Sequence, residues 1–148
     1  MFPSLSMLIA ALTLTVSASP SAAQEDRRSE MRMMGQCGNC IVSDLDYSEA
    51  RLTGIELQDA EIAGVSFSRA ALSLAIFDGA RITNVSFNGA NLRGASFVGA
   101  VLVNVSFDGA DLMGAVFEGA TLDQTDLLTG RLCKTQLPDD TMARSGCN

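Results

Sequence analysis

Residues 80–120 read ARITNVSFNGANLRGASFVGAVLVNVSFDGADLMGAVFEGA, and a large apolar residue returns at every fifth position from Ile82 to Phe117. A small residue stands two positions before most of them, so the apolar spacings alternate between two and three. A helix of 3.6 residues per turn would scatter these positions, and a straight strand would send alternate pairs to opposite faces. The chain must therefore bend every five residues, and four such units close a square coil.

The five-residue period runs from Tyr47 to Leu132, and a second period of twenty lies on top of it. Asn84-Val85-Ser86-Phe87, for example, recurs as Asn104-Val105-Ser106-Phe107. Reading every twentieth core position gives four columns: Val42, Ile62, Ile82, Leu102, Leu122; Tyr47, Phe67, Phe87, Phe107, Leu127; Leu52, Leu72, Leu92, Leu112, Leu132; and Leu57, Phe77, Phe97, Phe117, Leu137. The aromatic residues fall on two opposite sides. Glycines are expected at the corners, where the backbone angles favour them: Gly79, Gly89, Gly94, Gly99, Gly109, Gly114 and Gly119.

Two units carry a family resemblance. Ala90-Asn91-Leu92-Arg93-Gly94 and Ala110-Asp111-Leu112-Met113-Gly114 resemble the A(D/N)LxG unit of pentapeptide-repeat proteins. The resemblance covers residues 40–139 and implies an all-β fold, a right-handed quadrilateral β-helix of about five coils. Leu74 is an apolar residue at a corner that normally holds glycine or a polar residue, which allows a local bulge there.

The first 23 residues read as a signal peptide. They carry no charged side chain and include an apolar run from Met7 to Val16, which is too short to cross a bilayer core of ~30 Å. Small residues end the segment, so we expect cleavage between Ala23 and Gln24. The sequence therefore predicts export to the periplasm or the outside of the cell, with no membrane attachment after cleavage.

The segments flanking the repeats are predicted to cap the open ends of the solenoid, because solenoids need caps. Residues 24–39 are expected to contain a short helix, and residues 140–148 form the C-terminal cap. Cys37 with Cys40 flanks one end, and Cys133 with Cys147 flanks the other. The ends lie roughly 20 Å apart, so local disulfides within each pair are favoured in an oxidising compartment. An active dithiol at Cys37 and Cys40, or four free thiols, are the alternatives.

Composition argues against catalysis and against binding nucleic acid. The 148 residues contain no histidine, and 17 acidic residues face 10 basic ones. Histidine is the usual proton carrier near neutral pH and a common metal ligand, so no enzyme activity and no cofactor or metal is expected. Asp108, Asp111 and Glu118 form at most a weak calcium site, because they share no dedicated loop. Ser66, Ser86 and Ser106 are interpreted as a solvated surface ladder.

The function predicted first is a non-catalytic structural or protein-binding module, with an unknown protein partner or a second copy of the chain. Apolar side chains expected to point outward mark the possible interface: Ile76, Val98, Val101, Val103 and Val116. One alternative is an acidic rod that mimics DNA and acts on a topoisomerase, as some members of the pentapeptide-repeat family, which the sequence resembles, do. The other alternative is a thiol-redox protein that uses Cys37 and Cys40.

Overall fold

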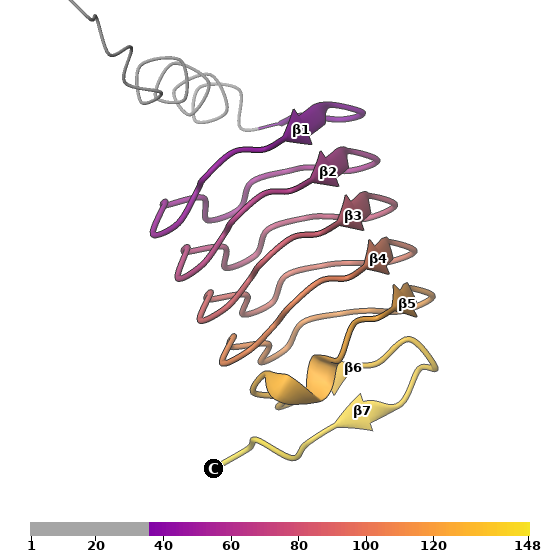
Figure 1. Ribbon diagram of the computed structural model, residues 1–148. Helices are drawn as coiled ribbons and strands as arrows, with labels where there is room; N and C mark the ends of the chain where they lie inside the picture. Colours follow the sequence, from indigo (N-terminus) through magenta and orange to yellow (C-terminus); the bar gives the residue numbers. More distant parts are fainter. Residues whose placement is uncertain (1–35) are drawn as a thin grey trace, which may run out of the picture.

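The computed structural model describes residues 36–148, which wind into a stack of flat four-sided coils (Figure 1). The predicted signal peptide, its cleavage site at Ala23 and Gln24, and residues 24–35 of the predicted N-terminal cap lie outside the described residues. No helix in the described part of the chain is long and apolar enough to span a membrane.

One side of the solenoid is a five-stranded parallel sheet in the order β1-β2-β3-β4-β5. Its strands are β1 (Ile41–Ser43), β2 (Glu61–Ala63), β3 (Arg81–Thr83), β4 (Val101–Val103) and β5 (Thr121–Asp123). Each strand pairs with the one twenty residues further on, as Val42 does with Ile62. Isolated parallel bridges repeat this twenty-residue offset on the other three sides, for example Asp46 with Ser66. The pairing confirms the predicted all-β solenoid with four sides.

The last turn of the solenoid differs from the earlier ones. The five strands enclose four complete turns, and the last bridge on the neighbouring side joins Val116 to Gln136. A short 3-10 helix, η1 (Leu127–Thr129), interrupts the fifth turn, and β6 (Thr135–Gln136) then pairs antiparallel with β7 (Met142–Ala143). The Leu137 N–H donates to the Thr141 carbonyl within this hairpin. Hydrogen bonds to the preceding turn nevertheless continue as far as Pro138, whose carbonyl accepts from the Gly119 N–H at 3.3 Å, so the fifth coil is present but irregular.

Residues 36–39, the described part of the predicted N-terminal cap, belong to the solenoid. Gln36 forms a parallel bridge with Glu56, and the Cys37 N–H donates to the Glu56 carbonyl at 2.8 Å. The Asn39 N–H donates to the Gln58 carbonyl at 3.0 Å. These four residues thus follow the same hydrogen-bonding pattern as the later coils rather than a helical one.

The core consists of the predicted columns. Phe67, Phe87 and Phe107 are fully buried and stack with centroids 5.2 Å apart along their column, and Phe77 stacks on Phe97 at 4.8 Å. The two aromatic columns meet edge to face across the core, as Phe87 and Phe97 do at 5.9 Å. Such contacts add about 0.5–1.5 kcal/mol each beyond area burial. Two predicted core residues at the C-terminal end, Leu122 and Leu137, are only partly buried.

The corners lie in the left-handed backbone region, which explains the glycines. Gly99, for example, has a φ of +65°. Leu74 occupies the same kind of corner with a φ of +59°. Its N–H still donates to the Arg93 carbonyl at 2.9 Å, so the register is unbroken and the bulge considered at this position does not form. Hydrogen bonds to the next coil hold the residue in a conformation that leucine rarely adopts.

Candidate protein-binding surface

Two adjoining sides carry the predicted interface residues. The sheet side is formed by β1–β5, and the Ile76 side is the side whose bridged column contains Glu56, Ile76, Ser96 and Val116. The chain passes from the Ile76 side to the sheet side at the corner between Val98 and Val101, where Ala100 points inward and is fully buried.

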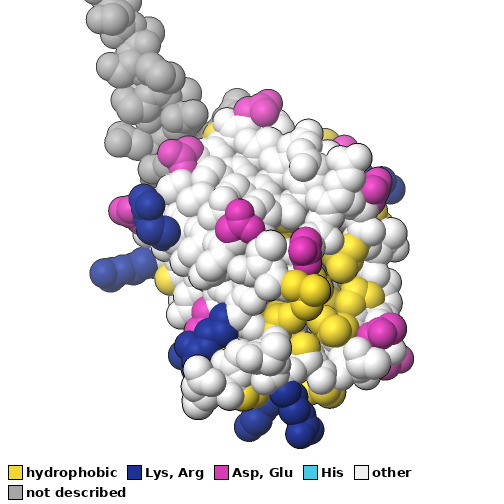
Figure 2. Space-filling model, turned by 60° about the horizontal axis from the view of Figure 1, so that its bottom comes forward, with side chains coloured by type: hydrophobic (Ala, Val, Ile, Leu, Met, Phe, Trp, Pro, Cys, Tyr) yellow, Lys and Arg dark blue, Asp and Glu magenta, His cyan; other side chains and the backbone are white. Residues whose placement is uncertain are grey.

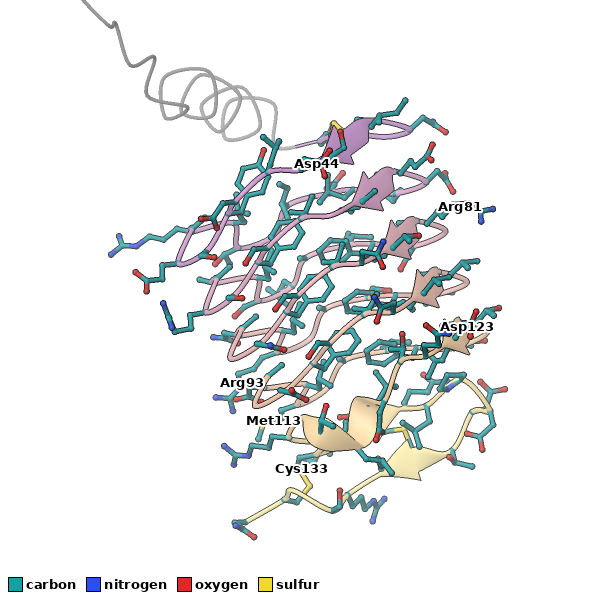
Figure 3. All side chains as sticks on the ribbon, viewed as in Figure 1. Asp44, Arg81, Arg93, Met113, Asp123 and Cys133 are labelled. Atoms are coloured by element: carbon teal, nitrogen blue, oxygen red, sulfur yellow. A yellow bond between two sulfur atoms is a disulfide. The ribbon has the colours of Figure 1, made fainter. Side chains whose placement is uncertain are left out.

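Three of the five predicted interface residues lie next to this corner. Val101 and Val103 flank the buried Leu102 on β4, and both are half-buried. Val98 lies three residues earlier on the Ile76 side and is also half-buried. Charged neighbours border the sheet side, with Arg81 on the adjacent β3 and Asp123 on the adjacent β5 (Figure 3). We call Val98, Val101 and Val103 the valine corner.

Ile76 and Val116 are less closely associated with it. They stand two turns apart in one bridged column, with Ser96 between them. Both are half-buried. The carboxylate of Asp78 accepts hydrogen bonds from the Ser96 hydroxyl and from the Val98 N–H, the latter at 3.0 Å. A fixed polar group therefore separates the apolar side chains on this side of the rod.

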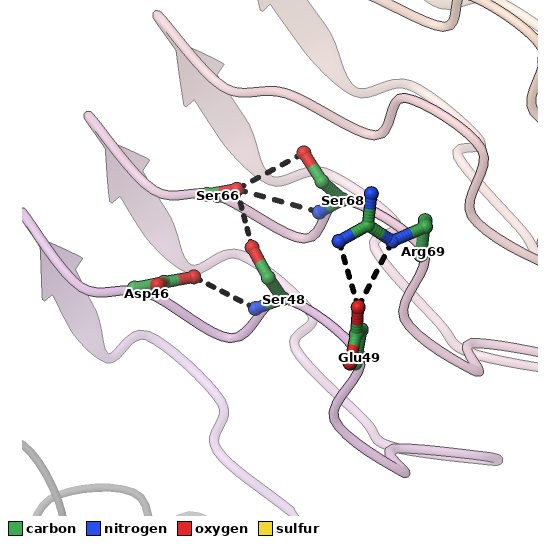
Figure 4. A network of polar contacts seen from close by, with 6 residues as sticks. All are labelled: Asp46, Ser48, Glu49, Ser66, Ser68 and Arg69. Carbon is green, nitrogen blue, oxygen red and sulfur yellow. Dashed lines mark hydrogen bonds and ion pairs between the residues drawn. The ribbon is translucent and has the colours of Figure 1, made fainter.

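The serines form a separate polar side. The hydroxyls of Ser48, Ser66 and Ser68 are hydrogen-bonded to one another at 2.9 and 3.1 Å, as Figure 4 shows. Ser106 donates to the side chain of Asn88. Nearby, exposed Arg69 forms an ion pair with Glu49 at 2.7 Å. No histidine exists in the chain to act as a base for these hydroxyls. The ladder is an ordered surface, and its geometry offers no activated nucleophile.

The N-terminal cysteine pair closes the first coil. Cys37 and Cys40 are joined by a disulfide with a Cα–Cα distance of 5.5 Å, and both pack against the core. Cys37 stands twenty residues before the buried Leu57, and Cys40 stands twenty before the buried Ala60. The two cysteines therefore occupy the inward positions that a large and a small residue hold in the next four turns. A thioredoxin-type dithiol instead sits at the start of a helix.

The C-terminal pair ties the hairpin to the last turn. Cys133 is 5% exposed and is joined to Cys147 with a Cα–Cα distance of 4.8 Å. β6 and β7 both lie within the loop that this disulfide closes. The bond therefore holds the hairpin against the end of the rod.

The candidate calcium ligands are not brought together. Among residues 36–148 no three side chains of histidine, cysteine, aspartate or glutamate lie close enough to share a metal ion. Asp111 has a cationic neighbour instead, with its carboxylate 3.8 Å from the Arg93 guanidinium. Arg93 also lies beside Met113 one turn on (Figure 3).

An apolar hollow that was not predicted from the sequence lies at the C-terminal end of the rod. Its volume is about 270 Å³, and Figure 2 shows hydrophobic side chains gathered on this part of the surface. The hollow, called here the end hollow, is lined by Leu122, Thr125, Asp126, Leu127, Leu128, Leu137, Pro138 and Asp139. The signal that could have revealed it is Leu128, an apolar residue at an outward position next to the break in the repeat.

Comparison with known families decides what kind of solenoid this is. The family described as pentapeptide repeats matches residues 47–91 with 9 copies and residues 90–127 with 8 copies. The two matches together cover more than half of the chain. The chain belongs to the pentapeptide-repeat family. No curated protein sequence matches it.

Several solved structures of pentapeptide-repeat proteins are similar. HetL, involved in heterocyst differentiation regulation in the cyanobacterium Nostoc sp., is 24% identical over 73% of this chain and 51% of HetL, with a TM-score of 0.43. QnrB1, a plasmid-mediated fluoroquinolone resistance protein, is 19% identical over 64% of each chain, with a TM-score of 0.46. A protein of the Arabidopsis thaliana thylakoid lumen is 24% identical over 68% of this chain and 69% of its own, with a TM-score of 0.33. This pentapeptide-repeat chain thus spans about half of HetL and under two thirds of QnrB1.

Proposed function

We propose that this pentapeptide-repeat chain is a non-catalytic protein-binding module that works in an exported compartment, periplasmic or secreted. The observation that carries the binding role is the valine corner. Val98, Val101 and Val103 present half-buried apolar side chains on two adjoining flat sides, with Arg81 and Asp123 at their border. An apolar patch with a charged rim is the usual composition of a protein contact surface.

The chemistry of the other sides supports a role without catalysis. The serine hydroxyls are engaged with one another and with Asn88, and the chain has no histidine. The carboxylate of Asp78 on the Ile76 side is held by two hydrogen bonds from the next coil. These polar groups form hydrogen bonds with one another and with neighbouring coils, which stabilises the surface of the rod.

Two features support the exported compartment. Both cysteine pairs lie at disulfide distance and are bonded, and such bonds persist in oxidising compartments. The sequence of residues 1–23 has the apolar run and the small terminal residues of a signal peptide. These residues lie outside the described part of the chain, so this support comes from sequence alone.

The binding role is tested by pull-down from the exported fraction with the full chain as bait. Val101→Ser/Val103→Ser removes two methyl-bearing side chains from the valine corner, and Asn91→Ser on a distant side is the control. A partner that wild type and control retain, and that the double variant loses at equal folded content, is the expected result. Equal retention by all three chains would overturn the valine corner as the contact surface.

The compartment is tested separately by cell fractionation of a C-terminally tagged chain. A product that lacks about the first 23 residues in the exported fraction is expected. An uncleaved product in the cytoplasm would overturn this part of the proposal.

A further inference from the structure

The most exposed large hydrophobic side chains of the described residues lie at opposite ends of the rod. Ile41, on the first strand, is 77% exposed, and Leu128, in η1 of the last turn, is 75% exposed. Single exposed apolar residues are ordinary on a protein surface. Leu128, however, lines the end hollow together with Leu122 and Leu137, so it belongs to a shaped apolar site.

The end hollow has an acidic rim. Asp126 and Asp139 both line it. The Asp126 carboxylate accepts a hydrogen bond from the Leu128 N–H at 2.8 Å, and the Asp139 carboxylate accepts one from the Thr141 N–H at 3.1 Å. Asp139 is exposed, and its carboxylate also accepts a hydrogen bond from the Thr141 hydroxyl at 2.7 Å. A ligand for this site would therefore present apolar atoms to the leucines and a cation to the two carboxylates.

The sequence just before the solenoid has this composition. Met31, Met33 and Met34 surround Arg32, only a few residues ahead of the first bridged residue, Gln36. Methionine side chains are flexible and fill irregular apolar surfaces well. Arg32 can form charge-assisted hydrogen bonds with rim carboxylates.

Reach decides which copy of the chain supplies this segment. The bridged column that begins at Gln36 reaches Gln136 after five steps, which corresponds to about 24 Å at ~4.8 Å per step. A fully extended chain spans at most ~3.6 Å per residue, so even Met31, the methionine farthest from Gln36, stays within about 18 Å of it. The methionines therefore cannot enter the end hollow of their own rod.

We propose that the end hollow binds the N-terminal end of a second copy of this chain. Met31, Met33, Met34 and Ile41 of one copy cover Leu122, Leu128 and Leu137 of the other, and Arg32 faces Asp126 and Asp139. The contact joins two different surfaces, so each copy keeps one free end and further copies add in a row. It uses the ends of the rod and is independent of the valine corner on its sides.

Sedimentation velocity of the full chain, in the form that the expressing cell delivers, tests this contact. We expect the average mass to rise over roughly 10 μM to 1 mM, the range of weak contacts between small surfaces. Ile41→Ser combined with Met33→Ser alters the N-terminal end, and Leu128→Ser alters the hollow. Each is expected to weaken association at least tenfold. Leu74→Ser, at a leucine that is 64% exposed on a distant corner, should associate like wild type.

Mixing the two end variants identifies the geometry. The Leu128→Ser chain keeps an intact N-terminal end, and the Ile41→Ser/Met33→Ser chain keeps an intact hollow. Their mixture should form one-to-one dimers and nothing larger, although each variant alone is monomeric. Three outcomes overturn the proposal: monomeric wild type at 1 mM, association that neither variant weakens, or self-association of the Ile41→Ser/Met33→Ser chain through hollow-to-hollow contact. Unchanged unfolding midpoints show that each variant is folded.

Discussion

The Gly146 N–H donates to the Leu132 carbonyl at 2.6 Å, and a Cβ on Gly146 would lie 2.9 Å from that same oxygen. The oxygen belongs to the backbone of the last turn, so it cannot rotate away. Gly146→Ala should therefore displace the C-terminal tail and lower the free energy of unfolding by about 1–3 kcal/mol, the usual range for overpacking. Urea unfolding measures this difference.

Gly38→Ala is the matched control for that substitution. Gly38 also lies next to a disulfide, but a Cβ there meets no atom within 4 Å. Its unfolding midpoint should stay within error of wild type. Equal destabilisation by both substitutions would show that the contact with Leu132 is not responsible.

The aromatic core predicts a position-dependent loss. Phe97 is fully buried and stacks on both Phe77 and Phe117 at 4.8 Å, whereas Phe117 stacks on Phe97 alone. Phe97→Ala should cost about 3–5 kcal/mol, as removal of a buried aromatic side chain usually does. Phe117→Ala should cost less, since it removes one stacking partner fewer. Chemical denaturation of both variants provides the comparison, and the reverse order would contradict the stacking argument.

The two disulfides should contribute unequally. The Cys133–Cys147 bond spans 14 positions, and the loop-entropy relation gives about 3 kcal/mol for a loop of that size. The Cys37–Cys40 bond spans 3 positions, for which the same relation gives about 1.6 kcal/mol. Paired cysteine-to-serine variants, unfolded with and without reductant, test this order. A larger loss at the N-terminal pair would mean that its packing against the core outweighs the entropic effect.

Leu74 is expected to be a site where a polar substitution stabilises. Its side chain is 64% exposed and its φ is +59°, so it contributes little burial and adopts an unfavourable backbone conformation. Asparagine tolerates this region better. Leu74→Asn should raise the free energy of unfolding by about 0.5–1 kcal/mol, within the ~1–2 kcal/mol that left-handed backbone costs a typical residue. Thermal unfolding would contradict this if the midpoint fell.

Asp139 predicts a pH dependence of the C-terminal cap. The hydroxyl and the N–H of Thr141 lower the pKa of the Asp139 carboxyl below its ordinary value of 3.8. A lowered folded-state pKa means that the stabilisation is present above the unfolded-state pKa and is lost as the pH falls through the folded-state value. Thr141→Val should therefore be less stable than wild type near neutral pH. The difference should shrink as the pH falls below about 4. A difference that persists unchanged in acid would implicate lost packing instead.

The sides of the rod could be predicted from the sequence because each core position is repeated. Phe87, for instance, recurs as Phe107 one turn later, and both are fully buried in one stacked column. The cysteine positions likewise fell at the ends of the rod, where the structure bonds them in local pairs. In a periodic sequence the same kind of core contact is encoded in several turns. A single exception such as Leu74 therefore does not hide the pattern.

The ends could not be predicted in the same way, since nothing repeats there. Leu137 continues the five-residue period, yet its N–H bonds to Thr141 and the chain turns back into a hairpin. Leu128 faces solvent because it occupies an outward position in the last turn. The end hollow thus forms where the solenoid ends. Residues that line it, such as Leu122 and Leu137, continue the five-residue period, so the sequence does not show where the solenoid ends.

The twenty-residue offset between paired residues, such as Val42 with Ile62, governs how this molecule can change in length. Deleting or duplicating twenty residues, for example 81–100, leaves every later side chain on its original side of the rod. The rod only becomes one coil shorter or longer. An insertion of five residues instead turns everything after it by a quarter revolution, which would carry the valines of β4 away from their present neighbours. A rod of this architecture can therefore be lengthened by gene duplication without changing its sides only when whole coils of twenty residues are added.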